Sequence, residues 1–317
     1  MDLSRLIMSL SRYLLPGGST SFWHTPIGAV TYDYSSLDYY YLDLSAKTAY
    51  KGPFDKEGIP MLDYRGNIGV QYNPCAASQY ALGLYQLYRQ GDKAALERFF
   101  NVADWLCQKI ELDENNNGLW GYYFDHDAYG LKSPWYSALA QGQGVSVLLR
   151  AYLVSGNEDY LRTAKAAYSG MILPVEKGGL LRREGDDVYL EEVVADRKTA
   201  ILDGMLFSLF AVQDLYFVTR EEAVLNLLIS CLDTIERKLP EYDLGYWSRA
   251  DLYQSDPPMV ASHFYHNLHV IQLGILGDMT GRAVFSEYSK RWQEYADSRL
   301  NRLNAFLKKV IFKLRYY

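Results

Sequence analysis

PWYSALAQGQGVSVLLRAYLV, residues 134–154, carries apolar side chains at spacings of three and four. This is the period of an α-helix. The stretch is apolar on more than one face, which is typical of a helix enclosed by other helices. The preceding pair Ser133-Pro134 offers an N-cap and a proline for the first helical position. We therefore predict a buried helix that starts at Ser133-Pro134.

Seven further stretches share the helical period, and Asn157 can cap one of them. They are residues 75–90, 94–110, 160–172, 199–218, 223–239, 265–279 and 285–303. The eight predicted helices come in pairs joined by Gly- and Asn-rich loops. We therefore predict a mainly α fold, an α/α toroid (barrel). A helical-repeat solenoid is the competing architecture, but no fixed-period self-similarity supports it.

The segment before the helices has a different pattern. Residues 29–60 are rich in aromatic and β-branched residues and are divided by Ser, Gly and Pro, which predicts a small N-terminal β-hairpin or sheet. We expect three parts along the chain: an N-terminal helix and β-rich segment over 1–70, the α/α-toroid domain over 71–298, and a basic amphipathic tail over 299–317.

Composition excludes several classes of protein. The 317 residues are 49% apolar and 22% charged, which excludes a disordered chain and a small disulfide scaffold. The three cysteines form no CxxC pair. No run of about 18 uncharged apolar residues is present, and the apolar N-terminal stretch lacks a cleavage site. We expect a cytoplasmic or peripheral membrane protein.

Charge is unevenly distributed along the chain. The net charge is −6, yet residues 299–317 contain six basic residues and no acidic one, so the rest of the chain carries −12. An acidic body is not typical of a nucleic-acid binder. In the tail, leucines follow helical spacing between the Lys and Arg residues. Such a helix can lie on an anionic membrane, bind an acidic polysaccharide, or simply be a solvated terminal helix.

Two motifs resemble metal-binding motifs in their spacing but lack the ligands or the geometry that a metal site needs. Asp113–Gly118 reads DENNNG and starts like a calcium loop, but Phe124 stands where the bidentate Glu is needed. We interpret it as a turn between helices. In HFYHNLH the histidines are spaced i, i+3 and i+6, which turns the first and last apart on a helix. The sequence therefore predicts no metal and no cofactor, and we expect these histidines to form hydrogen bonds in a cleft.

Two further segments have chemistry that suits a uronic acid. Glu191 and Glu192 are adjacent carboxylates between a loop and an apolar helix. Tyr246 and Arg249 lie in the loop-like stretch GYWSRADLY, where an Arg beside aromatic rings can hold a sugar carboxylate. The 29 tyrosines also suit a surface that stacks sugar rings, although tyrosine is equally a bulky core residue.

Several sequence blocks, in order, resemble the D-glucuronyl C5-epimerase family. They are PWYSALAQGQGVSVLLRAYL, LEE followed by LDGMLFSLFAVQDLY, YWSR, YHNLHVIQL and SEYSKRW, with GIPMLDYRGNIGVQYNPCAASQYALGLY upstream. The resemblance covers about residues 28–298. It implies a β-rich N-terminal part on an α/α barrel. It also implies conversion of polymer-linked D-glucuronate to L-iduronate without a redox cofactor, as in heparan sulfate biosynthesis.

The resemblance assigns roles residue by residue. C5 epimerisation needs two acid/base groups on opposite faces of the sugar ring and a cation for its carboxylate. By resemblance, Glu192 and Tyr265 are the two acid/base groups, Tyr246 assists proton transfer, and Arg249 binds the carboxylate. Further expected substrate-binding residues are Tyr72, Asn73, Gln79, Trp135, Gln141, Gln143 and His266.

The chain departs from the family pattern at two places. Val193 replaces the Tyr of the family's EEY triplet, with Tyr189 as a neighbouring substitute, and Asp203 replaces the Asn of its LNG block. Two alternatives stay open: a polysaccharide lyase, which starts with the same proton abstraction, and an inactive carbohydrate-binding homologue. The expected partner is an acidic polysaccharide and not a nucleic acid. Peripheral membrane contact through the tail and a homodimer are left open.

Overall fold

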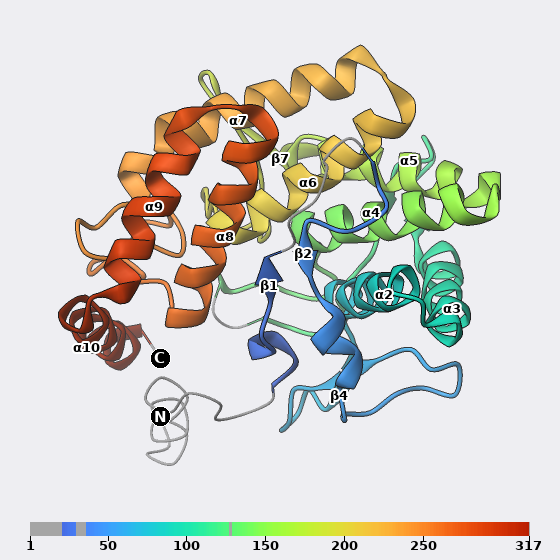
Figure 1. Cartoon of the computed structure of the whole chain (residues 1–317), viewed down its shortest axis with the longest axis horizontal. Helices are drawn as coiled ribbons and strands as arrows, with labels where there is room; N and C mark the ends of the chain where they lie inside the picture. Colours follow the sequence, from blue (N-terminus) through green and yellow to red (C-terminus); the bar gives the residue numbers. More distant parts are fainter. Residues whose placement is uncertain (1–20, 30–35, 127–128, 317) are drawn as a thin grey trace. The chain divides into compact units, whose positions relative to one another are not determined.

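The computed structural model describes residues 21–29, 36–126 and 129–316 of the chain. Helices account for 59% of the structure, which confirms the mainly α class. The predicted N-terminal helix lies outside the described residues. The α-helices are α2 (Pro74–Arg89), α3 (Lys93–Lys109), α4 (Ala138–Ser155), α5 (Glu158–Ile172), α6 (Leu202–Thr219), α7 (Glu222–Tyr242), α8 (His263–Thr280), α9 (Ala283–Asp297) and α10 (Arg299–Tyr316) (Figure 1).

The strands form short antiparallel pairs. They are β1 (Gly28–Ala29) with β2 (Leu42–Asp43), β3 (Met61–Asp63) with β4 (Val70–Tyr72), β5 (Glu111–Leu112) with β6 (Gly118–Leu119), and β7 (Leu181–Glu184) with β8 (Asp187–Leu190). The first pair falls in the segment where the sequence predicts a small β-hairpin. The DENNNG stretch is the turn between β5 and β6, in which the Asp113 carboxylate accepts the backbone N–H groups of Asn115 and Asn117, each at 2.8 Å.

The chain divides into two compact units. The first unit consists of Met1–Thr25, Ile201–Asp203 and Ile235–Tyr317, and it contains α8, α9 and α10. The second unit consists of Pro26–Ala200 and Gly204–Thr234, and it contains α2 to α5 and most of α6. Helices pack in sequential pairs within the units, α2 on α3 and α4 on α5 in the second, α8 on α9 in the first.

Helix α4 starts later than the sequence predicts. Ser137 is its N-cap, accepting from the Ala140 N–H at 3.4 Å, so the predicted start at Ser133-Pro134 is wrong. The reason is a non-local pairing: Trp135 exchanges both backbone hydrogen bonds with Tyr122, at 2.8 and 3.1 Å. A residue held in that bridge cannot also begin a helix. The Asn157 cap on α5 is confirmed, since its side chain accepts from the Asp159 N–H at 3.0 Å.

The glycines of the AQGQG stretch allow close packing of α4 in the second unit. A Cβ at Gly142 would lie 2.9 Å from the Ser208 Cα on α6, and one at Gly144 would lie 2.5 Å from the Trp120 ring. Real Cβ atoms do not approach so closely, so only glycine permits these contacts. The stretch is helical, as predicted; Gly142 allows α4 to pack against α6, and Gly144 allows it to pack against Trp120.

A buried ion pair lies in the core of the second unit. The Arg150 guanidinium on α4 donates to the Asp214 carboxylate on α6 at 2.6 Å, and both side chains are enclosed. Asp214 also accepts from the Tyr41 hydroxyl at 2.8 Å, and Arg150 donates to the Tyr39 carbonyl at 2.7 Å. The pair therefore ties the N-terminal segment beside β2 to two helices.

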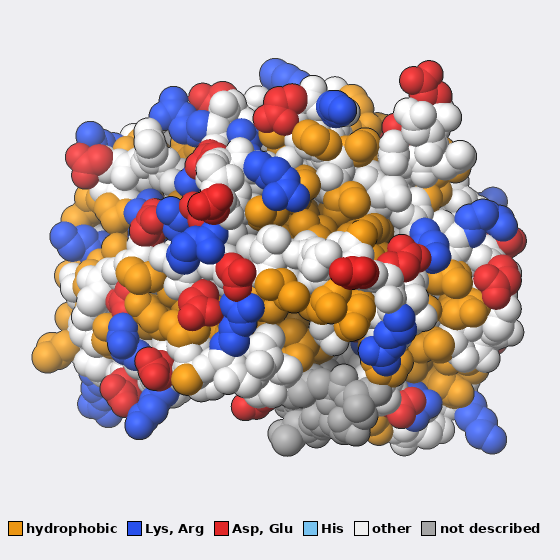
Figure 2. Space-filling view, turned by 90° about the horizontal axis from the view of Figure 1, so that it is seen from above, with side chains coloured by type: hydrophobic (Ala, Val, Ile, Leu, Met, Phe, Trp, Pro, Cys, Tyr) orange, Lys and Arg blue, Asp and Glu red, His pale blue; other side chains and the backbone are white. Residues whose placement is uncertain are grey.

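Among the described helices, only α6 is long and apolar enough to cross a membrane, and 72% of that stretch is buried inside the protein. It is a core helix by that measure. Figure 2 shows basic and acidic side chains interspersed with hydrophobic ones on the face in view.

Candidate functional site

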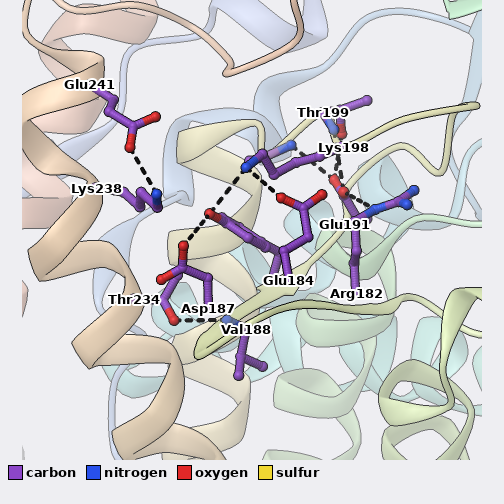
Figure 3. Close-up of polar contacts among 12 residues, drawn as sticks. Arg182, Glu184, Asp187, Val188, Glu191, Lys198, Thr199, Thr234, Lys238 and Glu241 are labelled. Carbon is purple, nitrogen blue, oxygen red and sulfur yellow. Dashed lines mark hydrogen bonds and ion pairs between the residues drawn. The ribbon is translucent and has the colours of Figure 1, made fainter.

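Glu191, the first of the two adjacent carboxylates, is a structural residue. Its oxygens accept from Arg182 Nε at 2.8 Å, Thr199 Oγ1 at 2.5 Å and the backbone N–H groups of Thr199 and Ala200 at 3.2 and 2.9 Å (Figure 3). Its backbone carbonyl accepts the first N–H of α4, that of Ala138. Both carboxylate oxygens of this fully buried side chain thus accept hydrogen bonds, and these bonds fix the chain after β8.

Glu192, the second carboxylate, is half-buried and lies across the start of α6. A Cβ on Gly204 would lie 2.1 Å from Glu192 Oε2 and 2.7 Å from its Cβ. The position of this side chain therefore depends on a glycine at residue 204. The sequence names Glu192 as a catalytic candidate, and its surroundings differ from those of Glu191 in leaving it partly accessible.

Tyr122 lies within electrostatic reach of Glu192, and sequence reasoning missed it. Its ring stacks on Trp135 with 3.9 Å between centroids and 7° between planes. Burial, and then the neighbouring Cys75 and Tyr64, raise the pKa of Tyr122 well above its usual value, and the Glu192 charge adds to the rise. The phenol therefore stays protonated. The glycine-flanked aromatic run GYYFD was the available signal in the sequence.

Asn73 stands on the other side of Tyr122. It caps α2 by accepting from the Ala76 N–H at 2.8 Å, and its amide donates to the Tyr64 hydroxyl at 2.6 Å. The Tyr122 hydroxyl lies 3.5 Å from Asn73 Oδ1. The structure therefore places Asn73 and Trp135, of the predicted residues, in contact with Tyr122, and Glu192 acts on Tyr122 only electrostatically. The neighbouring Tyr72 lies elsewhere, with its hydroxyl on Asp55 at 2.7 Å.

The three predicted glutamines are buried on α2 and α4. The Gln143 carbonyl accepts from the Cys75 thiol at 3.1 Å, and the Gln141 amide donates to the Trp120 carbonyl at 3.5 Å. Among the described residues, Gln79 Oε1 and Gln141 Oε1 have no hydrogen-bond partner. Buried amide oxygens are costly to leave in this state, so they are candidates for contact with a polar ligand.

A buried lysine, which no sequence pattern indicates, lies within electrostatic reach of Cys75. Lys47 is 1% exposed, and burial lowers its pKa to about 8. Cys75 is its electrostatic neighbour and raises that pKa slightly. A cation held in a protein interior is expensive unless it is matched by negative or polar groups.

In the first unit, the predicted Tyr246, Arg249 and Tyr265 lie around one small core. Tyr246 and Tyr265 are half-buried and pack against the cluster that contains Trp247 and Val260. The backbone of Arg249 pairs with that of Val260 as an isolated antiparallel bridge. The structure therefore places all three residues in the first unit, next to the same hydrophobic cluster.

Arg249 retains hydrogen-bonding capacity. Its guanidinium makes one long hydrogen bond, to the Tyr253 carbonyl at 3.5 Å, and its Nε is buried with no hydrogen-bond partner among the described residues. A guanidinium with unused donors can bind a carboxylate through two parallel hydrogen bonds. Burial raises the pKa of the neighbouring Tyr246, which keeps that phenol protonated.

Two histidines of α8, His266 and His269, form a buried chain with Ser248. The Ser248 hydroxyl lies 2.8 Å from His266 Nδ1 and 3.0 Å from His269 Nδ1, and His269 Nε2 lies 3.7 Å from an Asp203 oxygen. His266 Nε2 donates to the Trp292 carbonyl at 2.9 Å. Burial lowers the pKa of His266 to about 3, so its ring is neutral.

His266 is fully enclosed, which differs from the cleft position expected for it. Its ring stacks on Trp247 with 3.7 Å between centroids, and both ring nitrogens are engaged. These contacts hold the segment 247–249 against α8. Within this unit, His266 thus supports the backbone that carries Arg249.

Comparison with known proteins adds to this geometry. Residues 113–294, more than half of the chain, match the family model described as D-glucuronyl C5-epimerase C-terminus. Over 266 residues the chain is 28% identical to an uncharacterized protein of Methanocaldococcus jannaschii, which covers 76% of this chain and 85% of that protein.

A second relative has a named activity. Over 217 residues the chain is 27% identical to the D-glucuronyl C5-epimerase of Caenorhabditis elegans, covering 62% of this chain but only 35% of that enzyme's length. The family match and this distant relative suggest an epimerase-type function, consistent with an isomerase. The chain belongs to the D-glucuronyl C5-epimerase family.

Proposed function

We propose that the protein is a uronate C5-epimerase that converts D-glucuronate to L-iduronate residues in a heparosan-like polysaccharide. The observation that supports this best is the different environment of two adjacent carboxylates. The Glu191 carboxylate accepts hydrogen bonds from Arg182 and Thr199. Glu192 is half-buried, within electrostatic reach of a protonated Tyr122. A carboxylate so placed suits general acid/base chemistry.

The proposed reaction moves one proton off C5 and returns one to the opposite face. The Glu192 carboxylate takes the C5 proton, and the electron pair of the broken C–H bond passes into the neighbouring carboxylate as an enediolate. The Tyr265 phenol then donates its proton to C5 from the other face, which inverts that carbon. A proton from solvent restores Tyr265, and Glu192 releases its own to solvent. The reverse reaction exchanges the two roles.

Arg249 is proposed to hold the uronate carboxylate. The unused donors of its guanidinium match a carboxylate, and its charge stabilises the enediolate as negative charge develops. The same cation would lower the cost of a transient Tyr265 phenolate, because a free tyrosine ionises only near pH ~10. Tyr246, protonated under neutral conditions, is proposed to orient the substrate or relay a proton.

The remaining predicted residues fit binding and support roles. We propose that the stacked Trp135 and Tyr122 provide a sugar-facing surface and that Asn73, Gln79, Gln141 and Gln143 supply polar contacts. We assign His266 to positioning the Arg249 segment, given its enclosed ring. Tyr72, on Asp55, has the weakest support. The acidic polysaccharide partner, a homodimer and the α/α toroid, to which the sequential helix pairs lend support, stay predictions.

The test is isotope exchange on a glucuronate polymer in deuterated water. We expect deuterium at C5 together with iduronate signals in the NMR spectrum, and loss of both on Glu192→Gln. Glu184→Gln is the matched control, because Glu184 lies on the adjacent hairpin and is 44% exposed. Equal exchange by Glu192→Gln and the native protein would overturn the assignment of Glu192.

Two alternatives have distinct outcomes in the same experiment. A lyase would expel the C4 oxygen after proton abstraction and give an unsaturated product that absorbs in the ultraviolet. An inactive binding homologue would show no exchange on any uronate polymer. Val193 favours the latter, because it is buried and 4% exposed where the family carries a tyrosine.

A further inference from the structure

Helix α10 exposes a continuous apolar stripe. Leu300, Leu303, Leu307, Ile311 and Leu314 are 79%, 54%, 51%, 50% and 62% exposed. At about 100° per residue, their spacing places all five within an arc of about 80° of the helix. A surface stripe of five large aliphatic side chains is unusual, since scattered single residues are the norm.

The opposite face of α10 is fixed to the protein. Ala305, Lys309 and Phe312 are buried, and Lys309 Nζ donates to the Val260 carbonyl at 2.7 Å. Two turns beyond Lys309, the Tyr316 hydroxyl donates to the Asp256 carbonyl at 2.8 Å. These contacts on the inner face fix the rotation of α10 about its own axis, so the apolar stripe points away from the rest of its unit.

Basic residues border the stripe on both sides. By the same helical geometry, Arg299 flanks one edge, and Lys308 and Arg315 flank the other, while Arg302 and Lys313 lie farther round toward the inner face. Residues 299–316 contain no Asp or Glu. The face in Figure 2 instead has charges of both signs mixed together. The outer surface of α10 is therefore an apolar band between two cationic edges.

We propose that α10 docks this protein on an anionic lipid bilayer, lying in the interface plane with its leucine stripe among the acyl chains. An interfacial helix has this composition, with aliphatic residues on one face and Lys and Arg at its borders. The basic edges are placed to contact acidic headgroups, whose charge they complement. This inference does not depend on the proposed epimerase activity.

A bilayer would contact both the apolar stripe and the basic edges of α10. A second copy of the chain or an acidic polysaccharide would contact only one of these two features favourably. A second copy of α10 packed on the stripe would set cationic edges against each other, because the helix has no acidic residue to pair with them. An acidic polysaccharide would contact the basic edges and leave the five aliphatic side chains in water. A bilayer takes up the stripe and the edges together.

Vesicle co-sedimentation of the full chain tests the proposal. We expect binding to phosphatidylcholine vesicles that contain phosphatidylglycerol, and weak or no binding to phosphatidylcholine alone. The variant Leu303→Ser/Leu307→Ser/Ile311→Ser should lower the partition coefficient at least about tenfold, since binding scales with buried apolar area. The matched control is Leu153→Ser/Ile229→Ser, which removes exposed aliphatic residues outside α10 and should leave partitioning unchanged.

A charge variant separates the two features. Lys308→Gln/Arg315→Gln should weaken binding to the acidic vesicles and reduce its dependence on salt, with no change in thermal unfolding. Native-like circular dichroism of all variants makes the comparison valid, and the substituted side chains are exposed.

Four outcomes would overturn the proposal. One is absence of binding to the acidic vesicles, and another is binding that the triple serine variant retains. A third is a dimer in sedimentation velocity that this variant abolishes without any vesicle binding, which would make the stripe a contact between copies. Binding of heparosan that only the charge variant weakens, with no vesicle binding, would likewise identify a polysaccharide as the occupant.

Discussion

Arg150 and Asp214 form an ion pair, 2.6 Å between nitrogen and oxygen, in which both side chains are at most 1% exposed. We expect Asp214→Asn to lower the free energy of unfolding by about 3–5 kcal/mol, because it leaves a guanidinium buried without its counter-charge. Urea denaturation measures the change.

The control is an exposed pair in the same unit. Lys165 and Glu221 are about half-exposed at 2.8 Å, so Glu221→Gln should cost under about 1 kcal/mol. The double change Arg150→Met/Asp214→Leu should recover much of the loss, since it leaves no charge without a partner. A cost for Asp214→Asn as small as that of Glu221→Gln would show that the buried pair is not what secures this core.

Replacement of Gly204 should displace the Glu192 carboxylate. In Gly204→Ala the new Cβ meets both the Cβ and Oε2 of Glu192, so the side chain must move. We expect about a hundredfold loss of deuterium exchange at C5, the usual effect of moving a catalytic group by about an ångström. Gly274→Ala is the control, because its Cβ would meet only Ser289 Oγ at 3.3 Å. Full activity in Gly204→Ala would contradict the placement of Glu192.

We expect the function proposed for Arg249 to depend on the paired N–H donors of its planar guanidinium, and not only on its positive charge. Arg249→Lys keeps the cation but loses the paired donors, and we expect kcat/KM to fall about tenfold or more. Steady-state kinetics on a glucuronate polymer provide the measurement. Arg291→Lys, which alters an exposed arginine at 3.4 Å from Asp243, should have native kinetics. Unchanged kinetics in Arg249→Lys would remove this residue from the proposed site.

Acidification should destabilise the fold through His266. Burial lowers the pKa of His266 to about 3 in the folded chain, while an unfolded histidine titrates near ~6.5. Below about pH 6.5 His266 binds a proton in the unfolded state but stays neutral in the folded state, so the free energy of unfolding falls as the pH drops toward 3. This one group should cost about 2 kcal/mol between pH 7 and pH 5.

Urea denaturation at the two pH values, with His266→Gln for comparison, isolates that contribution. The glutamine cannot take up a proton, so its loss of stability between pH 7 and pH 5 should be smaller than that of the native protein. Groups remote from His266 contribute equally to both proteins and cancel in the difference. An equal pH dependence in both would show that His266 is protonated in the folded state.

Helical periodicity is a local property, and it predicted the helices well. The bounds of α2, α3 and α5 agree with the sequence to within a few residues. The errors came from contacts that local patterns do not contain. The Trp135–Tyr122 bridge delays the start of α4, and the chain interrupts the last predicted helix at Ser298, between α9 and α10.

The site residues came from family resemblance and stay a prediction, and residue type alone does not reveal their surroundings. The adjacent Glu191 and Glu192 look alike in the sequence, whereas only Glu191 is shown to accept hydrogen bonds from Thr199 and Arg182. Tyr122 was missed because its contacts with Trp135 and Asn73 are not visible in the local sequence pattern. His266 was expected in a cleft, yet the Trp247 stack encloses it.

The contact between Gly204 and Glu192 has a consequence for how related chains diverge. Any lineage that replaces this glycine with a larger residue must also move or discard the carboxylate, so the two positions are expected to change together. On the catalytic role proposed for Glu192, loss of the glycine would mark loss of catalysis, even in a related chain that still carries the glutamate. The residue at position 204 would then separate active from inactive members of the family.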